Sequence, residues 1–110
     1  MEIKKVVEGE TLTIEIIGKL DATTAIKLDT ELKDSVIGMK KLIFDLAKLN
    51  YIASAGFRVL LKYQKQADRN NCTMKIKNVK SEIREIFYMT GFSDFLNITD
   101  DSVKKLSIEF

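Results

Sequence analysis

The residues best suited to chemistry in this sequence form a short run of small side chains around one serine. Ser54 stands in the segment Ala53-Ser54-Ala55-Gly56, between a mostly apolar stretch and a segment with helical periodicity. Backbone N–H groups at a helix N-terminus have no intrahelical partners and carry a partial positive charge, so a hydroxyl there can cap the helix. A phosphate on that hydroxyl would face the same unpaired donors. Two interpretations of Ser54 are therefore open, a helix cap and a phosphorylation site.

Most other kinds of catalytic site are excluded by composition. The sequence has no histidine, which removes Ser-His-Asp and Cys-His catalysis and the HExxH metal site. Its single cysteine, Cys72, cannot form an intrachain disulfide, a CxxC redox pair or a thiolate zinc site. Ser54 also lacks the G-x-S-x-G turn that exposes the nucleophile of serine hydrolases. These absences argue against most kinds of small soluble enzyme and against a metal site.

Charge and hydropathy predict a cytoplasmic protein whose partners are neither nucleic acids nor membranes. The 18 basic and 16 acidic side chains leave a net charge of +2, which is too balanced for a typical nucleic-acid binder. No apolar stretch is long enough to cross a membrane. The N-terminal residues lack the apolar h-region of a secretory signal peptide, so we expect Cys72 to stay reduced in the cytoplasm.

Hydrophobic periodicity predicts the elements that must position the serine. A strand-like run over 3–7, a turn at Gly9 and alternating apolar and polar residues over 11–17 predict an opening β-hairpin. Asp21 is expected to cap a helix, because apolar residues recur every three or four positions after it. The mostly apolar run 41–46 is too short for a free helix, so it predicts a central strand covered on both faces.

The second half of the chain continues the same alternation of helices and strands. A helix follows the serine segment, and period-two alternation over 72–77 predicts another strand. A third helix is expected to be capped by Asn78 or Ser81 and closed by Gly91. The order ββαβαβα within a single domain, 1–110, predicts an α/β fold with a partly parallel sheet. Six helix residues are expected to pack against that sheet: Leu28, Leu32, Leu60, Tyr63, Ile83 and Phe87.

Four short motifs, taken together, resemble the STAS domain of the bacterial anti-sigma factor antagonists. They occur in the family's order and with its spacing over residues 3–99. They are GKLD at 18–21, LIFDL at 42–46 followed by LNYI at 49–52, SAGFRVLL at 54–61, and MTGF at 89–92 followed by Phe95. The resemblance implies a single domain with a mixed β-sheet of about four to five strands covered by about four helices.

The same resemblance implies a regulatory switch, which is not an enzyme and needs no cofactor of its own. Such antagonists bind an anti-sigma factor that is also a serine kinase; phosphorylation of a loop serine ends the binding, and a serine phosphatase restores it. The family serine aligns with Ser54, and a monomer is expected for a chain that docks onto a kinase dimer. The resemblance implies that the partner-binding residues are Asp21, Thr23, Thr24, Ala53, Ala55, Gly56 and Arg58.

Two positions keep alternatives open. The best-studied family members have an aspartate immediately before the serine, where this sequence has Ala53, although relatives with a small residue there also exist. That departure favours a second function, a non-phosphorylated accessory STAS module in a transport or sensory complex. Asp21 likewise has two interpretations, a helix cap alone and a cap that also contacts the partner.

Overall fold

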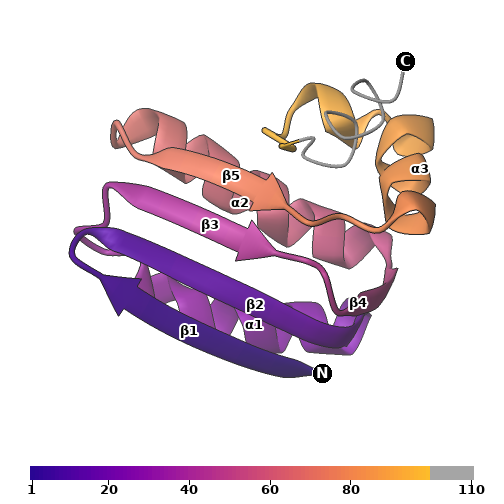
Figure 1. Ribbon diagram of the computed structural model, residues 1–110, viewed down its shortest axis with the longest axis horizontal. Coiled ribbons are helices and arrows are strands. Elements are labelled where there is room, and N and C mark those ends of the chain that lie inside the picture. Colours follow the sequence, from indigo (N-terminus) through magenta and orange to yellow (C-terminus); the bar gives the residue numbers. More distant parts are fainter. Residues whose placement is uncertain (100–110) are drawn as a thin grey trace, which may run out of the picture.

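The strands and helices follow the predicted order, with one additional strand. In a computed structural model, which describes residues 1–99, the chain begins with the predicted hairpin, β1 (Glu2–Glu8) and β2 (Thr11–Leu20). It continues through α1 (Ala22–Ser35), β3 (Lys41–Asp45), β4 (Leu49–Ile52), α2 (Ser54–Arg69), β5 (Thr73–Lys77), α3 (Ser81–Thr90) and the 3-10 turn η1 (Phe92–Asp94) (Figure 1). The last part of the predicted domain, 100–110, lies outside the described residues.

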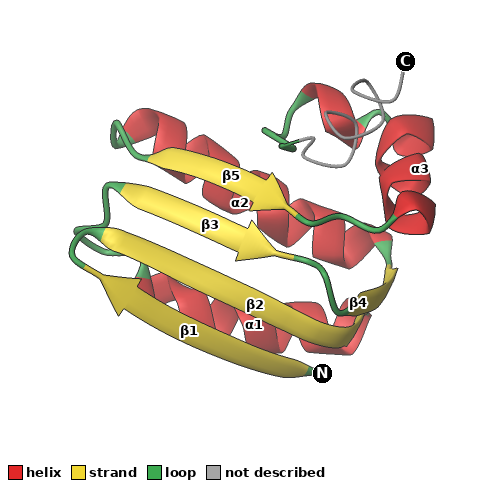
Figure 2. Ribbon diagram, viewed as in Figure 1, coloured by secondary structure: helices red, strands yellow, loops and turns green. Residues whose placement is uncertain are grey.

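The five strands form one mixed sheet, as predicted. The strand order is β1-β2-β3-β5, and β4 pairs with the far end of β2 (Figure 2). β1 is antiparallel to β2, whereas the other pairs are parallel. Because β2 and β4 run in the same direction, with Leu20 opposite Ile52, the loops that follow them leave the sheet at the same edge. This register brings the Asp21 and Ser54 segments together.

The helices α1 and α2 cover one face of the sheet (Figure 1). Alternate residues of β3 are buried, namely Leu42 and Phe44, while Lys41, Ile43 and Asp45 between them are only half-buried. The prediction that this strand is covered on both faces is therefore wrong. Its two ends are charged and fall on the same side, so the run is an alternating strand rather than a fully buried one.

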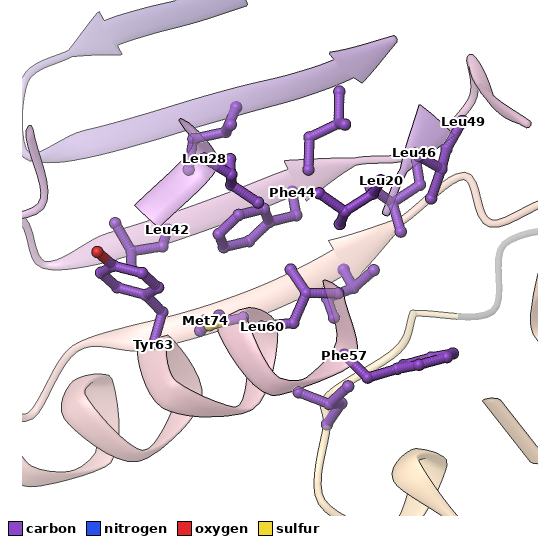
Figure 3. Packing of buried hydrophobic residues seen from close by; sticks show 14 of the residues in the cluster. Leu20, Leu28, Leu42, Phe44, Leu46, Leu49, Phe57, Leu60, Tyr63 and Met74 are labelled. Atoms are coloured by element: carbon purple, nitrogen blue, oxygen red, sulfur yellow. The ribbon is translucent and has the colours of Figure 1, made fainter. Parts of the chain in front are cut away.

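The core lies between the helices and this covered face (Figure 3). All six helix residues predicted to pack there are buried, among them Leu60 and Tyr63 of α2. Phe57 links α2 to the C-terminal elements, because its ring packs edge-on against Phe87 and stacks on Phe92, each at a centroid distance of 4.7 Å. These contacts hold the first turn of α2 firmly against the rest of the molecule.

Two details of the helices differ from the prediction. Residues 1–99 contain three α-helices and one 3-10 turn, instead of about four helices. The N-cap of α3 is Lys80, with no side-chain hydrogen bond, rather than Asn78 or Ser81. Asn78 adopts a left-handed φ of 59° and its side-chain amide donates to Asp45 Oδ1 at 3.2 Å, so its side chain serves the sheet edge instead of the helix. Gly91 closes α3 in the left-handed conformation, as predicted.

Candidate partner-binding site around Ser54

Ser54 is the first residue of α2, and its side chain is exposed. The N-cap is Ala53, with extended backbone angles of φ −102° and ψ 170° and no side-chain hydrogen bond. A capping hydroxyl must stand at the N-cap itself, one residue before the position of Ser54. The interpretation of Ser54 as a helix cap is therefore wrong. Among the residues the structure describes, its hydroxyl has no hydrogen-bond partner.

The start of α2 is fixed to the end of β2. The Ala53 N–H donates to the carbonyl oxygen of Leu20 at 2.9 Å, and the Ala53 carbonyl accepts from the Gly56 N–H at 2.9 Å. Gly56 is buried, and a Cβ there would lie 2.7 Å from Leu20 Cγ and 3.0 Å from Ile52 Cγ1. Only a residue without a side chain allows the helix to approach this closely. Gly56 therefore lies beneath the predicted partner surface and positions it.

Asp21 is the N-cap of α1, as predicted, and forms a complete capping box with Thr24. Its Oδ1 accepts from the backbone N–H groups of Thr23 at 3.0 Å and Thr24 at 2.9 Å. The Asp21 N–H in turn donates to Thr24 Oγ1 at 2.8 Å. The Thr24 backbone N–H and, next in effect, the Thr24 hydroxyl donate hydrogen bonds to the Asp21 carboxyl and lower its pKa. Asp21 is thus a carboxylate at neutral pH, and the hydroxyl of Thr24 is committed to the cap.

A shallow groove of about 250 Å³ runs between α1 and α2 beside Ser54. Of the predicted partner-binding residues, Ala55 and Arg58 line it, whereas Asp21 and Thr23 lie outside it. The α1 side of this groove was not predicted from the sequence, above all Ile26, which is 70% exposed. The sequence does contain a signal for this surface. Ile26 is apolar but falls outside the three-to-four-residue repeat of the buried residues of α1. The groove is lined by Ala22, Ala25, Ile26, Asp29, Thr30, Ala55, Arg58 and Val59.

A polar clamp sets the spacing of the two helices beside the groove. Asp29 of α1 accepts a hydrogen bond from the Tyr63 hydroxyl at 2.6 Å and from Lys62 Nζ at 2.9 Å, both on α2. The Tyr63 hydrogen bond, followed by that of Lys62, lowers the pKa of the Asp29 carboxyl. Burial, reinforced by Asp29, raises the pKa of Tyr63. The clamp thus consists of a carboxylate, an ammonium group and a neutral phenol, and it joins the two walls of the groove.

Other kinds of site are not seen in the part of the chain that the structure describes. Residues 1–99 contain no group of three His, Cys, Asp or Glu side chains placed to hold a metal ion. None of their helices combines the length and the apolar character needed to cross a membrane. Cys72 lies just before β5 instead of within it, is half-buried, and has its pKa raised by burial, which keeps it a thiol.

Comparison with protein-family models identifies the family of this chain. The model of the STAS domain matches residues 2–105. The chain belongs to the STAS domain family. Over 76 residues this STAS domain is 34% identical to BtrV of Bordetella bronchiseptica, which carries the name anti-sigma factor antagonist. The match covers 68% of this chain and 66% of BtrV, just under two thirds of that relative.

Solved structures with the same fold include an anti-sigma factor antagonist and a sulfate transporter family protein. The unphosphorylated form of SpoIIAA, described as an anti-sigma factor antagonist, matches with a TM-score of 0.76 and 14% identity, covering 98% of this STAS domain and 96% of that chain. The phosphorylated form of Bacillus SpoIIAA matches with a TM-score of 0.70 and 14% identity, over 97% and 99% of the two chains. A sulfate transporter family protein from Wolinella succinogenes matches with a TM-score of 0.73 and 19% identity, over 96% and 93%. At such identities these likenesses concern the fold alone.

Proposed function

We propose that this STAS domain is an anti-sigma factor antagonist, and that phosphorylation of Ser54 by a serine kinase ends its binding to the anti-sigma factor. The observation that carries the proposal is the exposed hydroxyl of Ser54, which starts α2 between two alanines and has no hydrogen-bond partner in the described residues. The name of BtrV and the two forms of SpoIIAA support it. The anti-sigma factor is expected to be the kinase itself.

The proposed partner surface is the sheet edge where β2 and β4 end. It comprises the exposed Thr23 and Arg58, the half-buried Asp21, Ala53 and Ala55, and the groove between α1 and α2. Small side chains on both sides of Ser54 leave room for the active site of a kinase. Gly56 and the hydroxyl of Thr24 contribute by holding this surface in shape.

In the phosphoryl transfer, Ser54 Oγ would form a bond to the γ-phosphorus of ATP while the bond from that phosphorus to the β–γ bridging oxygen breaks and ADP leaves. A catalytic base of the kinase would take the serine proton. The kinase supplies ATP and Mg²⁺, and this chain supplies the acceptor hydroxyl. The product carries close to two negative charges at a helix N-terminus, where unpaired N–H groups stabilise them, so the fold changes little. The interface changes more, because the phosphate adds bulk and charge beside the Asp21 carboxylate and must be desolvated on docking.

In this scheme the domain acts in the cytoplasm as a monomeric binding module without catalytic activity. Binding of the anti-sigma factor frees a sigma factor and so changes transcription. A serine phosphatase hydrolyses the phosphate on Ser54 and returns the domain to its binding state.

The test compares Ser54 with a serine in the same local setting. Ser81 is also exposed, also starts a helix, and also follows an N-cap residue without a side-chain hydrogen bond. After incubation with the anti-sigma kinase and ATP, mass spectrometry should find phosphate on Ser54 and not on Ser81. Ser54→Asp should bind the anti-sigma factor more weakly than Ser54→Ala, whereas Ser81→Asp should bind like the wild type. Equal binding by the two Ser54 variants would contradict the proposal.

A second candidate function is an accessory STAS module in a transport or sensory complex. Ala53 favours it, because the best-studied family members have an aspartate at that position, and the fold of the Wolinella succinogenes protein agrees with it. Such a module would bind its complex without phosphate on Ser54. Binding to a membrane transporter that is equally tight for Ser54→Ala and Ser54→Asp would favour this function over the switch.

A further inference from the structure

The exposed face of α2 carries a line of four cations that the partner surface described above uses only at one end. We call Arg58, Lys62, Lys65 and Arg69 the basic stripe. They recur every three or four residues, and all four side chains are exposed. With Leu61, which is half-buried, they line a groove of about 340 Å³. At 3.6 residues per turn the stripe lies opposite the core-facing side of the helix.

Most of this positive charge has no ion-pair partner among residues 1–99. Lys62 is paired with Asp29, but Arg58, Lys65 and Arg69 form no ion pair with any residue in the described part of the chain. The only acidic residue of α2, Asp68, accepts a hydrogen bond from Gln64. Like charges on one helix face repel one another, so the isolated domain gains nothing from this arrangement. An acidic surface placed against it would remove the repulsion.

We propose that the basic stripe docks an acidic surface of the anti-sigma factor. This inference rests on the proposed function and extends it from the first turn of α2 to the whole helix. Ser54, Arg58, Leu61 and Lys65 stand at positions i, i+4, i+7 and i+11, so the serine lies at the head of the stripe. The face from Ser54 to Arg69 is about 22 Å long, which is long enough to lie across a protein surface.

The composition of the stripe favours a protein over other acidic partners. A single-stranded nucleic acid needs aromatic side chains on which its bases stack, and the stripe has none. A helix that lies on a membrane inserts an apolar face into the lipid, but the apolar face of α2 is already buried in the core. Arginines around a small apolar centre, here Leu61, are typical of a protein–protein interface.

The position of Ser54 links the stripe to phosphorylation. Side chains at i and i+4 of a helix are neighbours, so phosphate on Ser54 can pair with the Arg58 guanidinium. In that ion pair the charge of Arg58, at the Ser54 end of the basic stripe, is neutralised and no longer attracts the partner. Lys65 and Arg69 lie about 16 Å and 22 Å further along the helix, beyond the screening length of roughly 8–10 Å at physiological salt. These two residues therefore report on docking without touching the phosphorylation site.

The experiment removes two charges from the far end of the stripe. Calorimetry of the full chain with the anti-sigma factors of its source organism compares the wild type with Lys65→Gln/Arg69→Gln. The matched control, Lys4→Gln/Lys75→Gln, removes the same charge from the helix-free face of the sheet. We expect the stripe variant to bind about five to ten times more weakly at low salt and the control to bind within about twofold of wild type. At high salt the difference should shrink.

The outcomes separate this inference from the proposed function. If the stripe variant binds as tightly as the wild type while Ser54→Asp binds weakly, the stripe is not an interface and the switch stands. If the stripe variant binds weakly while Ser54→Asp binds like Ser54→Ala, the stripe stands and the switch fails. If no anti-sigma factor binds, both fail. Phosphatidylglycerol vesicles and duplex DNA serve as further probes, and tight binding of either one that Lys65→Gln/Arg69→Gln abolishes would overturn the assignment to a protein.

Discussion

Gly56 and Leu20 touch so closely that a single added carbon would not fit between them. A Cβ on Gly56 would lie 2.7 Å from Leu20 Cγ and 2.9 Å from Leu20 Cδ2. The same end of β2 also accepts the hydrogen bond from the Ala53 N–H. The packing of Gly56 against Leu20 therefore fixes the distance between the start of α2 and the end of β2. The position of Ser54 depends on this distance.

Replacing Gly56 by alanine should consequently disturb both stability and the site. The added methyl group must displace Leu20 or lift the first turn of α2, and overpacking of this kind costs about 1–3 kcal/mol. Urea denaturation measures the change in the free energy of unfolding. Ala55→Ser, at the half-buried neighbouring position, is the control and should stay near wild type. A Gly56→Ala variant as stable as wild type would mean that Leu20 moves aside without cost.

Leu60→Ala should destabilise the domain by about 2–5 kcal/mol, because Leu60 is fully buried between α2 and the sheet. The neighbouring Leu61 is half-buried on the other side of the helix. Leu61→Ala removes the same atoms and should cost clearly less. Chemical denaturation of both variants compares the two faces directly, and equal losses would mean that the helix is rotated from the orientation described.

Asp21 allows the cap to be separated from its charge. Asp21→Asn keeps an oxygen that can accept from the Thr23 and Thr24 N–H groups, so its thermal midpoint should stay near wild type. Asp21→Ala loses the cap, and its midpoint should fall. If the carboxylate also contacts the partner, the asparagine variant should still bind the anti-sigma factor more weakly. Unchanged affinity in Asp21→Asn would leave Asp21 with its capping role alone.

The clamp at Asp29 should make the free energy of unfolding depend on pH. The pKa of the Asp29 carboxyl is lowered in the folded state, so this carboxyl binds a proton more readily in the unfolded chain. The stability it contributes is therefore complete above the pKa of the unfolded chain, near pH 4, and is lost as the pH falls through the lower folded value. Asp29→Asn should be less stable than wild type at pH 7, and the gap should narrow below about pH 4. A gap that stays constant down to pH 2 would exclude the ionised clamp.

Local patterns in the sequence were sufficient for most of the fold. Period-two alternation located β2 and β5, and helical periodicity located all three α-helices. The turn at Gly9 placed β1 before β2 as the first strand of a hairpin. β4 was missed because only its end residues, Leu49 and Ile52, are buried, so it shows no alternation. β4 is a strand because it pairs with the end of β2, which is distant in the sequence. A local sequence pattern cannot predict such a pairing.

The features of the site that depend only on residues adjacent in the sequence were predictable. The cap at Asp21 requires only the residues that follow it, and the exposure of Ser54 follows from its place at a helix start. The capping role of Ser54 was wrong by one residue, which is the usual uncertainty of a helix boundary. The clamp joins Asp29 to Lys62 and Tyr63, more than thirty residues away, so only the folded arrangement could reveal it.

The pairing of β4 also determines how the serine segment can move. β4 has four residues and, among the described strands, pairs with β2 alone, whereas β3 has a hydrogen-bonded neighbour on each side. A short strand with one neighbour opens at a lower free energy than the global unfolding of the domain. Its amide protons should therefore exchange with solvent sooner than those of β3. Such opening lets the chain before Ser54 extend into an enzyme's cleft while the core beneath α2 stays folded.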